Sequence, residues 1–146
     1  MGRLIAIDFG RKRCGIAATD PLQLIANPIE TIATAQLSSY IKAYIAANDV
    51  DAVIVGQPKQ MDGTPSESTR YLTPAINRLR KDIAPTPIIF YDERFTSVLA
   101  HRAMIDGGMS KMARRDKAVI DKISAAIILN DYISSRNGAN APQMPL

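Results

Sequence analysis

The N-terminal stretch LIAIDFGRKRCGIAA constrains the fold more than any other part of this chain. Two apolar runs flank a short turn, in which Gly10 is the conformationally permissive residue. This arrangement predicts buried strands at 3–8 and 14–19, paired as an antiparallel hairpin. The first strand ends on the carboxylate of Asp8. A cluster of positive charge follows it directly: Arg11, Lys12 and Arg13. A carboxylate that ends a buried strand beside cations is also the first indication of function.

The rest of the chain alternates strand-like and helix-like segments. Short apolar or β-branched runs predict strands at 28–32, 51–56 and 86–93. Apolar residues at helical spacing predict helices at 35–47 and 117–135, and a further helix that contains Ile76, Leu79 and Ile83. A helix at 96–106 is predicted from Thr96 as its N-cap and from the two glycines that follow Asp106. This further helix either opens at Pro74 after a Thr73 cap or begins earlier and is kinked at Pro74. An opening hairpin followed by strand–helix units indicates the α/β class, with a mixed sheet and helices on its faces.

Length and composition agree with a single domain. The chain has 146 residues, of which 47% are apolar and 22% charged, as is ordinary for a globular protein. We expect one domain over residues 1–136 and a flexible C-terminal tail over 137–146. A net charge of +4 hints at an anionic partner. The single cysteine, the absence of a signal peptide and the lack of a membrane-length apolar run indicate a soluble protein of the reducing cytoplasm, without a membrane role.

Acidic residues stand out at three places. Asp8 ends the first strand, and the pair Asp92 and Glu93 ends the last one. Asp121 lies on a helical stripe of mostly apolar residues, which includes Ala125, so it should face the body of the protein. Carboxylates that are brought together repel one another, and a hard divalent cation such as Mg²⁺ or Mn²⁺ relieves that repulsion. Two such ions can activate a water and stabilise the leaving oxygen in phosphodiester cleavage.

Each acidic place also has an ordinary structural explanation. A lone Asp at the end of a strand is commonly a turn or cap residue. Nearby cations offer salt bridges: Arg94 or Arg102 for the pair 92–93, and Lys117 or Lys122 for Asp121. The coincidence of three acidic places at strand ends or on an inward stripe is what favours a site. A single histidine and a single cysteine argue against a zinc site or a Cys-His nucleophile pair.

Positive charge gathers in two patches, each next to one acidic place. The first patch is the turn 11–13 that follows Asp8. The second patch precedes the helix of Asp121 and contains Lys111, Arg114, Arg115 and Lys117. Cations around an acidic site are typical of a groove that follows a nucleic-acid backbone. The alternative for either patch is a solvated charged loop.

Four segments in this order resemble the YqgF family: IAIDFGRKRCGIA, VIVGQPKQMDGT, YDERFTS and KAVIDKISAAIIL. These proteins are described as pre-16S rRNA nucleases and as Holliday junction resolvase-like, and the resemblance runs from Leu4 to Tyr132. It implies an RNase H-like fold with a mixed five-stranded sheet, whose first three strands are antiparallel, and helices on both faces. It also implies a cytoplasmic nuclease that matures the 5′ end of 16S rRNA, with RNA in ribosomal precursor particles as its partner.

The resemblance assigns roles to individual residues. Asp8, Glu93 and Asp121 match the family's acids, so they are expected to be catalytic and to bind Mg²⁺ or Mn²⁺, with two ions during catalysis. Because neighbours on a strand face opposite ways, only one of Asp92 and Glu93 is expected to be a direct ligand. The family's hairpin and loop positions are matched by Gly10, Gly15, Gly56, Pro58, Met61, Asp62 and Gly63.

Several functions share this set of acids. The chain departs from the family pattern at Arg11, Gln57 and Pro74, and none of these departures removes an acid. The leading interpretation is a metal-dependent nuclease acting on precursor rRNA. A resolvase that cuts four-way DNA junctions would use the same residues, and a non-catalytic nucleic-acid-binding module would not need them. IAIDFG also resembles the first phosphate motif of sugar kinases and actin-like ATPases, but those folds need a second domain, for which the chain is too short.

Overall fold

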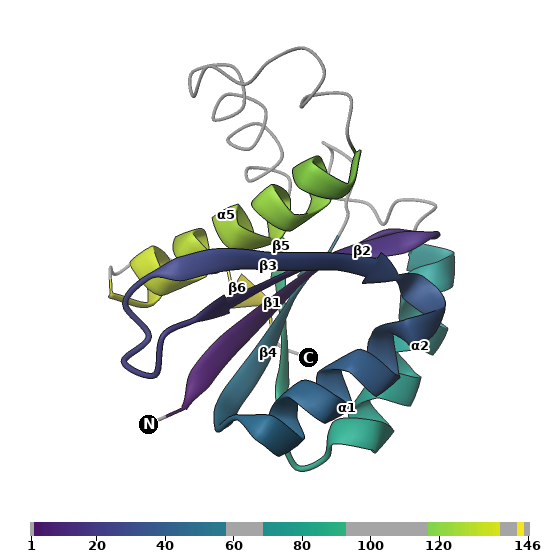
Figure 1. Cartoon of the computed structure of the whole chain (residues 1–146), viewed down its shortest axis with the longest axis horizontal. Helices are drawn as coiled ribbons and strands as arrows, with labels where there is room; N and C mark the ends of the chain where they lie inside the picture. Colours follow the sequence, from purple (N-terminus) through teal and green to yellow (C-terminus); the bar gives the residue numbers. More distant parts are fainter. Residues whose placement is uncertain (1, 58–68, 93–116, 138–142, 145–146) are drawn as a thin grey trace.

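The computed structural model describes residues 2–57, 69–92, 117–137 and 143–144 (Figure 1). The strands are β1 (Arg3–Phe9), β2 (Arg13–Thr19), β3 (Ala26–Ala33), β4 (Val50–Gln57), β5 (Ile88–Asp92) and β6 (Gln143–Met144). The helices are the 3-10 helix η1 (Thr34–Gln36) and the α-helices α1 (Leu37–Ala47), α2 (Thr69–Ile83) and α5 (Lys117–Asn137). Within these ranges, none of the helices is long and apolar enough to cross a membrane.

A single mixed sheet organises the chain, with strand order β3-β2-β1-β4-β5-β6. The first three strands are antiparallel, β4 and β5 run parallel to β1, and β6 returns antiparallel to β5. Parallel neighbours need crossover connections, and here α1 leads into β4 while α2 leads from β4 into β5. The predicted α/β class and the antiparallel start of the sheet are confirmed. The short strand β6 makes the sheet six-stranded, where five strands were expected.

Two segments differ in detail from the sequence prediction. Helix α2 begins at Thr69 and has Pro74 inside it, so the earlier of the two predicted starts is the one adopted. The segment 137–146 was predicted to be a tail, but its residues Gln143 and Met144 pair with β5. The predicted helix at 96–106 lies outside the described residues.

Both faces of the sheet are covered, and β1 contributes to both. Ile5 and Ile7 face the side on which α1 and α2 pack, whereas Leu4 and Ala6 face α5. Figure 1 shows α5 on one side of the sheet and the pair α1 and α2 on the other. A strand buried on both faces must be apolar at successive positions, which explains why its sequence does not alternate. Asp8 continues the even-numbered series, so its side chain lies on the α5 side.

Candidate functional site

Asp8 lies near the end of β1 in the middle of the sheet. In the strand register it is opposite Gly15 on β2 and Gly56 on β4. Paired strands on both sides fix the backbone of Asp8, and its side chain is half-buried on the α5 side. The two glycines carry no side chain next to the carboxylate, so the sheet surface around Asp8 is open to groups from α5.

Gly15 brings α5 down onto this part of the sheet. A Cβ atom at Gly15 would collide with the carbonyl group of Asp121 and the backbone nitrogen of Lys122. The backbone of α5 therefore touches β2 directly at this glycine, one strand away from Asp8. Asp121 is half-buried there, and the next residues on its stripe, Ala125 among them, are fully buried, as the sequence predicted.

Asp121 forms an ion pair across the fold with Arg13. The Nε atom of Arg13 donates to Oδ2 of Asp121 at 2.6 Å. The side chains are 37% and 23% exposed, so solvent screens the pair, and it stabilises the fold by about 1 kcal/mol or less. The sequence had suggested Lys117 or Lys122 as partners of Asp121. The structure instead joins Asp121 to the cationic turn that follows Asp8.

The turn between β1 and β2 is fixed by two further neighbours. Thr34 donates its backbone N–H to the carbonyl of Lys12 at 3.0 Å and its hydroxyl to the carbonyl of Gly10 at 2.7 Å. The guanidinium of Arg11 lies over the ring of Tyr71 on α2, 4.6 Å from the ring centroid, which is a cation–π contact. Arg11 and Arg13 therefore have side-chain contacts within the fold, whereas the side chain of Lys12 is exposed.

These residues surround one pocket of about 390 Å³. It is lined by Asp8, Phe9, Gly10, Arg11, Lys12, Arg13 and Asp121. Carboxylates and cations line the same space, so a divalent cation and an anionic group can bind there side by side. The arrangement suits a phosphate that is held against a metal ion.

The buried thiol of Cys14 lies in the core on the α1 and α2 side of the sheet. Burial raises the pKa of Cys14, and hydrogen bonds with the Thr34 side chain and the Gly10 backbone partly offset that rise. The negative charges of Asp8 and Asp121 raise the pKa of Cys14 a little further. The thiol is therefore neutral at physiological pH, and Cys14 has the packing role of a small apolar residue.

The structure brings together one part of the predicted site. Asp8, Asp121 and the cationic turn 11–13 meet in the pocket, with Gly10, Gly15 and Gly56 around them. Lys117 is the first residue of α5, but its side chain is not described, and neither is that of Asp92. The other predicted residues lie outside the described ranges: Glu93, Lys111, Arg114, Arg115, Pro58, Met61, Asp62 and Gly63.

The described residues of the pocket have donor atoms of the type that a divalent cation prefers. Two carboxylates on one pocket supply the oxygen atoms that Mg²⁺ and Mn²⁺ prefer. In the described part of the chain, no three acidic, histidine or cysteine side chains gather closely enough to form a metal site. Glu93 is the predicted third ligand, and it directly follows the last residue of β5 in sequence.

Two functional neighbours were not found from the sequence. Tyr71 has the spacing of an ordinary helical residue, and only the packing of α2 against the turn brings it to Arg11. Thr34 is the first residue of η1, directly after β3, and its hydrogen bonds to a distant turn leave no sequence signal. Pairing of Arg13 with Asp121 likewise depends on how α5 crosses the sheet.

The fold is shared with solved structures of RuvC. The structure superposes on a structure of Thermus thermophilus RuvC in complex with a Holliday junction substrate, with a TM-score of 0.58, 17% sequence identity, and coverage of 99% of this chain and 100% of that chain. A second T. thermophilus RuvC structure matches with a TM-score of 0.54 and 15% identity, over 97% of this chain and 99% of the other. The fold is therefore RNase H-like, as the resemblance implied.

Sequence comparison then narrows the class to one family. Residues 2–135 match the family model described as RuvX: Holliday junction resolvase. A Phocaeicola vulgatus protein named "Putative pre-16S rRNA nuclease" is 52% identical over 136 residues, which cover 93% of this chain and 98% of that protein. A Flavobacterium johnsoniae protein of the same name is 45% identical over 93% of this chain and 99% of its own length. The chain belongs to the RuvX family, and the resemblance found in the sequence is confirmed.

Proposed function

We propose that this protein is a metal-dependent nuclease that hydrolyses phosphodiester bonds in the 5′-end processing of pre-16S rRNA. The observation that carries the proposal is the meeting of Asp8 and Asp121 with three cations around one pocket. These acids are far apart in sequence, and β1 and α5 bring them together. Family membership and the names of relatives that cover nearly the whole chain support the same activity.

The proposed metal ligands are Asp8, Glu93 and Asp121. When Mg²⁺ or Mn²⁺ is bound, a pair of ions supplies an activated water and stabilises the leaving oxygen. The residues of the chain contribute rigid placement, because β1 is paired on both sides at Asp8 and the backbone of α5 rests on Gly15. Fixed carboxylates need little reorganisation during the reaction, which is the main source of electrostatic catalysis.

The cations are proposed to hold the RNA backbone. Arg11, Lys12 and Arg13 line the pocket beside the acids, where they can bind phosphates on either side of the cleaved bond. We propose the same role for the second patch, which contains Lys111, Arg114, Arg115 and Lys117. The loop residues Gly56, Pro58, Asp62 and Gly63 are proposed to shape the same edge of the sheet. We propose that the protein acts in the cytoplasm on ribosomal precursor particles.

A cleavage assay tests the proposal. A labelled RNA that carries the 5′ precursor segment of 16S rRNA is incubated with purified protein, with Mn²⁺ or Mg²⁺, and with excess chelator. We expect cleavage only with metal, and none by an Asp8→Asn variant purified in the same way. Cleavage that persists in chelator, or in the variant, would show that the acidic pocket is not the nuclease site.

The second candidate is a Holliday junction resolvase. Two observations favour it: the description of the matched family model and the fold shared with RuvC. A resolvase makes paired symmetric cuts, which a twofold dimer favours. Paired nicks in a four-way DNA junction, made by a protein with the solution mass of a dimer, would favour this function over RNA processing. Binding of either substrate without cleavage by a metal-loaded protein would instead indicate a non-catalytic module.

A further inference from the structure

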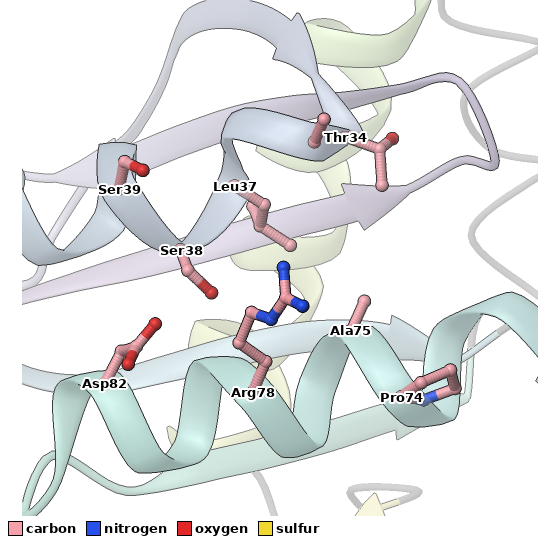
Figure 2. A pocket seen from close by; sticks show the side chains of 9 residues that line it. Thr34, Leu37, Ser38, Ser39, Pro74, Ala75, Arg78 and Asp82 are labelled. Atoms are coloured by element: carbon pink, nitrogen blue, oxygen red, sulfur yellow. The ribbon is translucent and has the colours of Figure 1, made fainter.

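A second pocket, of about 450 Å³, opens between the start of α1 and helix α2. Figure 2 shows its two walls: Leu37 and Ser38 on α1, and Ala75, Arg78 and Asp82 on α2. The volume is in the range of pockets that hold small ligands, and it is ample for one nucleotide base. Neither the proposed metal ligands nor the cationic turn lines this pocket.

Arg78 and Asp82 give the pocket a donor group and an acceptor group. They are one helical turn apart and both are exposed, and neither side chain forms a hydrogen bond or an ion pair with a residue in the described part of the chain. The order arginine before aspartate is the less favourable one for pairing along a helix. In Figure 2 the guanidinium of Arg78 extends toward Leu37, whereas the carboxylate of Asp82 is directed toward Ser38. The space between the two groups remains available to a ligand.

The second pocket lies on the α1 and α2 side of the sheet and the acidic pocket on the α5 side, and the turn between β1 and β2 links the two. Thr34 lines the second pocket, and its hydroxyl donates to the carbonyl of Gly10, which lines the acidic pocket. On the other wall, Tyr71 holds Arg11 and precedes Ala75 by about one turn of α2. A strand of nucleic acid that crosses the turn between β1 and β2 would therefore meet both pockets.

We propose that the second pocket binds an unpaired guanine base of the RNA whose backbone is cleaved at the acidic pocket. Guanine presents two acceptors, O6 and N7, which match the paired donors of an arginine, and two donors, N1–H and N2–H₂, which match a carboxylate. Adenine and cytosine each offer only one donor group to Asp82, and uracil offers one N–H. Ala75, which is half-buried, supplies apolar surface for the base. Proteins commonly read single-stranded RNA through the edges of exposed bases.

This inference rests on the proposed function for its biological meaning, but binding can be measured without cleavage. Isotope-labelled protein is titrated with GMP, AMP, CMP and UMP while the backbone amide signals are followed by NMR. We expect GMP to shift signals of Ser38, Ala75 and Arg78, and to bind about tenfold or more tightly than AMP. Equal binding of all four nucleotides, or shifts confined to other regions, would overturn the proposal.

Two variants and one modified nucleotide assign the contacts. Inosine monophosphate lacks the 2-amino group, so the native protein should bind it more weakly than GMP. Asp82→Asn should abolish that difference, because the amide no longer holds the N2 donor as a carboxylate does. Arg78→Lys keeps the charge but loses the planar fork, and it should reduce the preference for GMP. The matched control is Arg80→Lys, an exposed arginine on the same helix that lines neither pocket, and it should bind as the native protein does.

The outcomes separate this proposal from the nuclease proposal. If GMP is preferred and no RNA is cleaved, the base pocket stands and the nuclease function fails. If RNA is cleaved in a metal-dependent way and GMP is not preferred, the nuclease stands and the guanine pocket is wrong. An Arg80→Lys protein that loses the preference for GMP as strongly as Arg78→Lys would also contradict the pocket, because the loss would then not depend on a residue that lines it.

Discussion

The two ends of β1 use polar side chains in opposite ways. At the N-terminal end, the buried amide of Gln23 donates to the carbonyl of Gly2 at 2.6 Å and to Asp51 at 2.7 Å, and it accepts from Arg136 at 2.8 Å. Next to it, Asp20 accepts hydrogen bonds from three backbone N–H groups. This end, which we call the closed end, has its polar groups satisfied within the chain.

At the other end of β1, the charged side chains of the turn are not all paired within the described part of the chain. Arg11 rests on an aromatic ring, and Lys12 has no side-chain partner among the described residues. Arg13 and Asp121 form a pair that solvent still reaches. A buried polar group must be hydrogen-bonded within the protein, whereas a binding site has donors and charges that remain available to a ligand. The difference therefore assigns the closed end to the stability of the fold and the other end to ligand binding.

The largest expected effect is on catalysis at the acidic end. Asp8→Asn keeps the shape of the side chain and removes one negative charge, so the free energy of unfolding should change by about 1 kcal/mol or less. Cleavage should fall by a factor of about a hundred or more, because a lost metal ligand removes several kcal/mol of transition-state stabilisation. Single-turnover cleavage and thermal unfolding are measured on the same preparation. A large loss of stability would assign Asp8 to the fold instead.

At the closed end we expect the opposite result, a loss of stability without a loss of catalysis. Gln23→Ala leaves the Gly2 carbonyl, Asp51 and the Arg136 guanidinium without this partner, and we expect a loss of about 1–3 kcal/mol in the free energy of unfolding. Cleavage per folded molecule should be unchanged. Denaturant unfolding measures the first quantity and active-site titration the second. The control is Leu24→Ala, since Leu24 is 66% exposed and should be replaceable with little effect.

A smaller effect is expected on nucleic-acid affinity. Arg11→Ala should weaken RNA binding and reduce the slope of log K against log salt by about 0.7–0.9, as for one lost phosphate contact. Arg80→Ala is the control, because it removes an equal charge from an exposed position outside both pockets. Fluorescence anisotropy over a series of salt concentrations gives both slopes. If the two variants have the same slope, the turn contributes only general charge.

The smallest expected effect is electrostatic and concerns Cys14. Burial is the main reason that the pKa of Cys14 is raised above its ordinary value of 9.0, and the charge of Asp8 adds to it. Asp8→Asn should therefore lower the pKa of Cys14 slightly, while burial keeps it above the ordinary value. A raised pKa of the thiol adds to the stability of the fold at pH values below the pKa of the thiol in the unfolded chain. This added stability is lost as the pH rises through the pKa of the thiol in the folded protein. The Cβ signal of Cys14 followed by NMR against pH reports both values, and an unchanged pKa would mean that the Asp8 charge does not reach the thiol.

Much of the fold follows from local patterns. The hairpin, the buried strands and the inward stripe of Asp121 depend on residue spacing, and spacing is written in the sequence. The start of α2 could not be decided, because a proline is compatible with the first turn of a helix and, at a cost, with its interior. The pairing of β6 was missed because two residues in a polar, proline-containing segment carry no strand signal of their own.

The candidate site was predicted residue by residue, but its contacts were not. The sequence by itself determined the acidic and basic residue types, their order and their placement at the ends of elements. Only the tertiary structure decided that Asp121 pairs with Arg13, that Arg11 rests on Tyr71, and that Gly15 lets α5 reach the sheet. The physical reason is that side-chain type and periodicity are local properties, whereas these contacts join residues separated by tens of positions and depend on how one element packs on another.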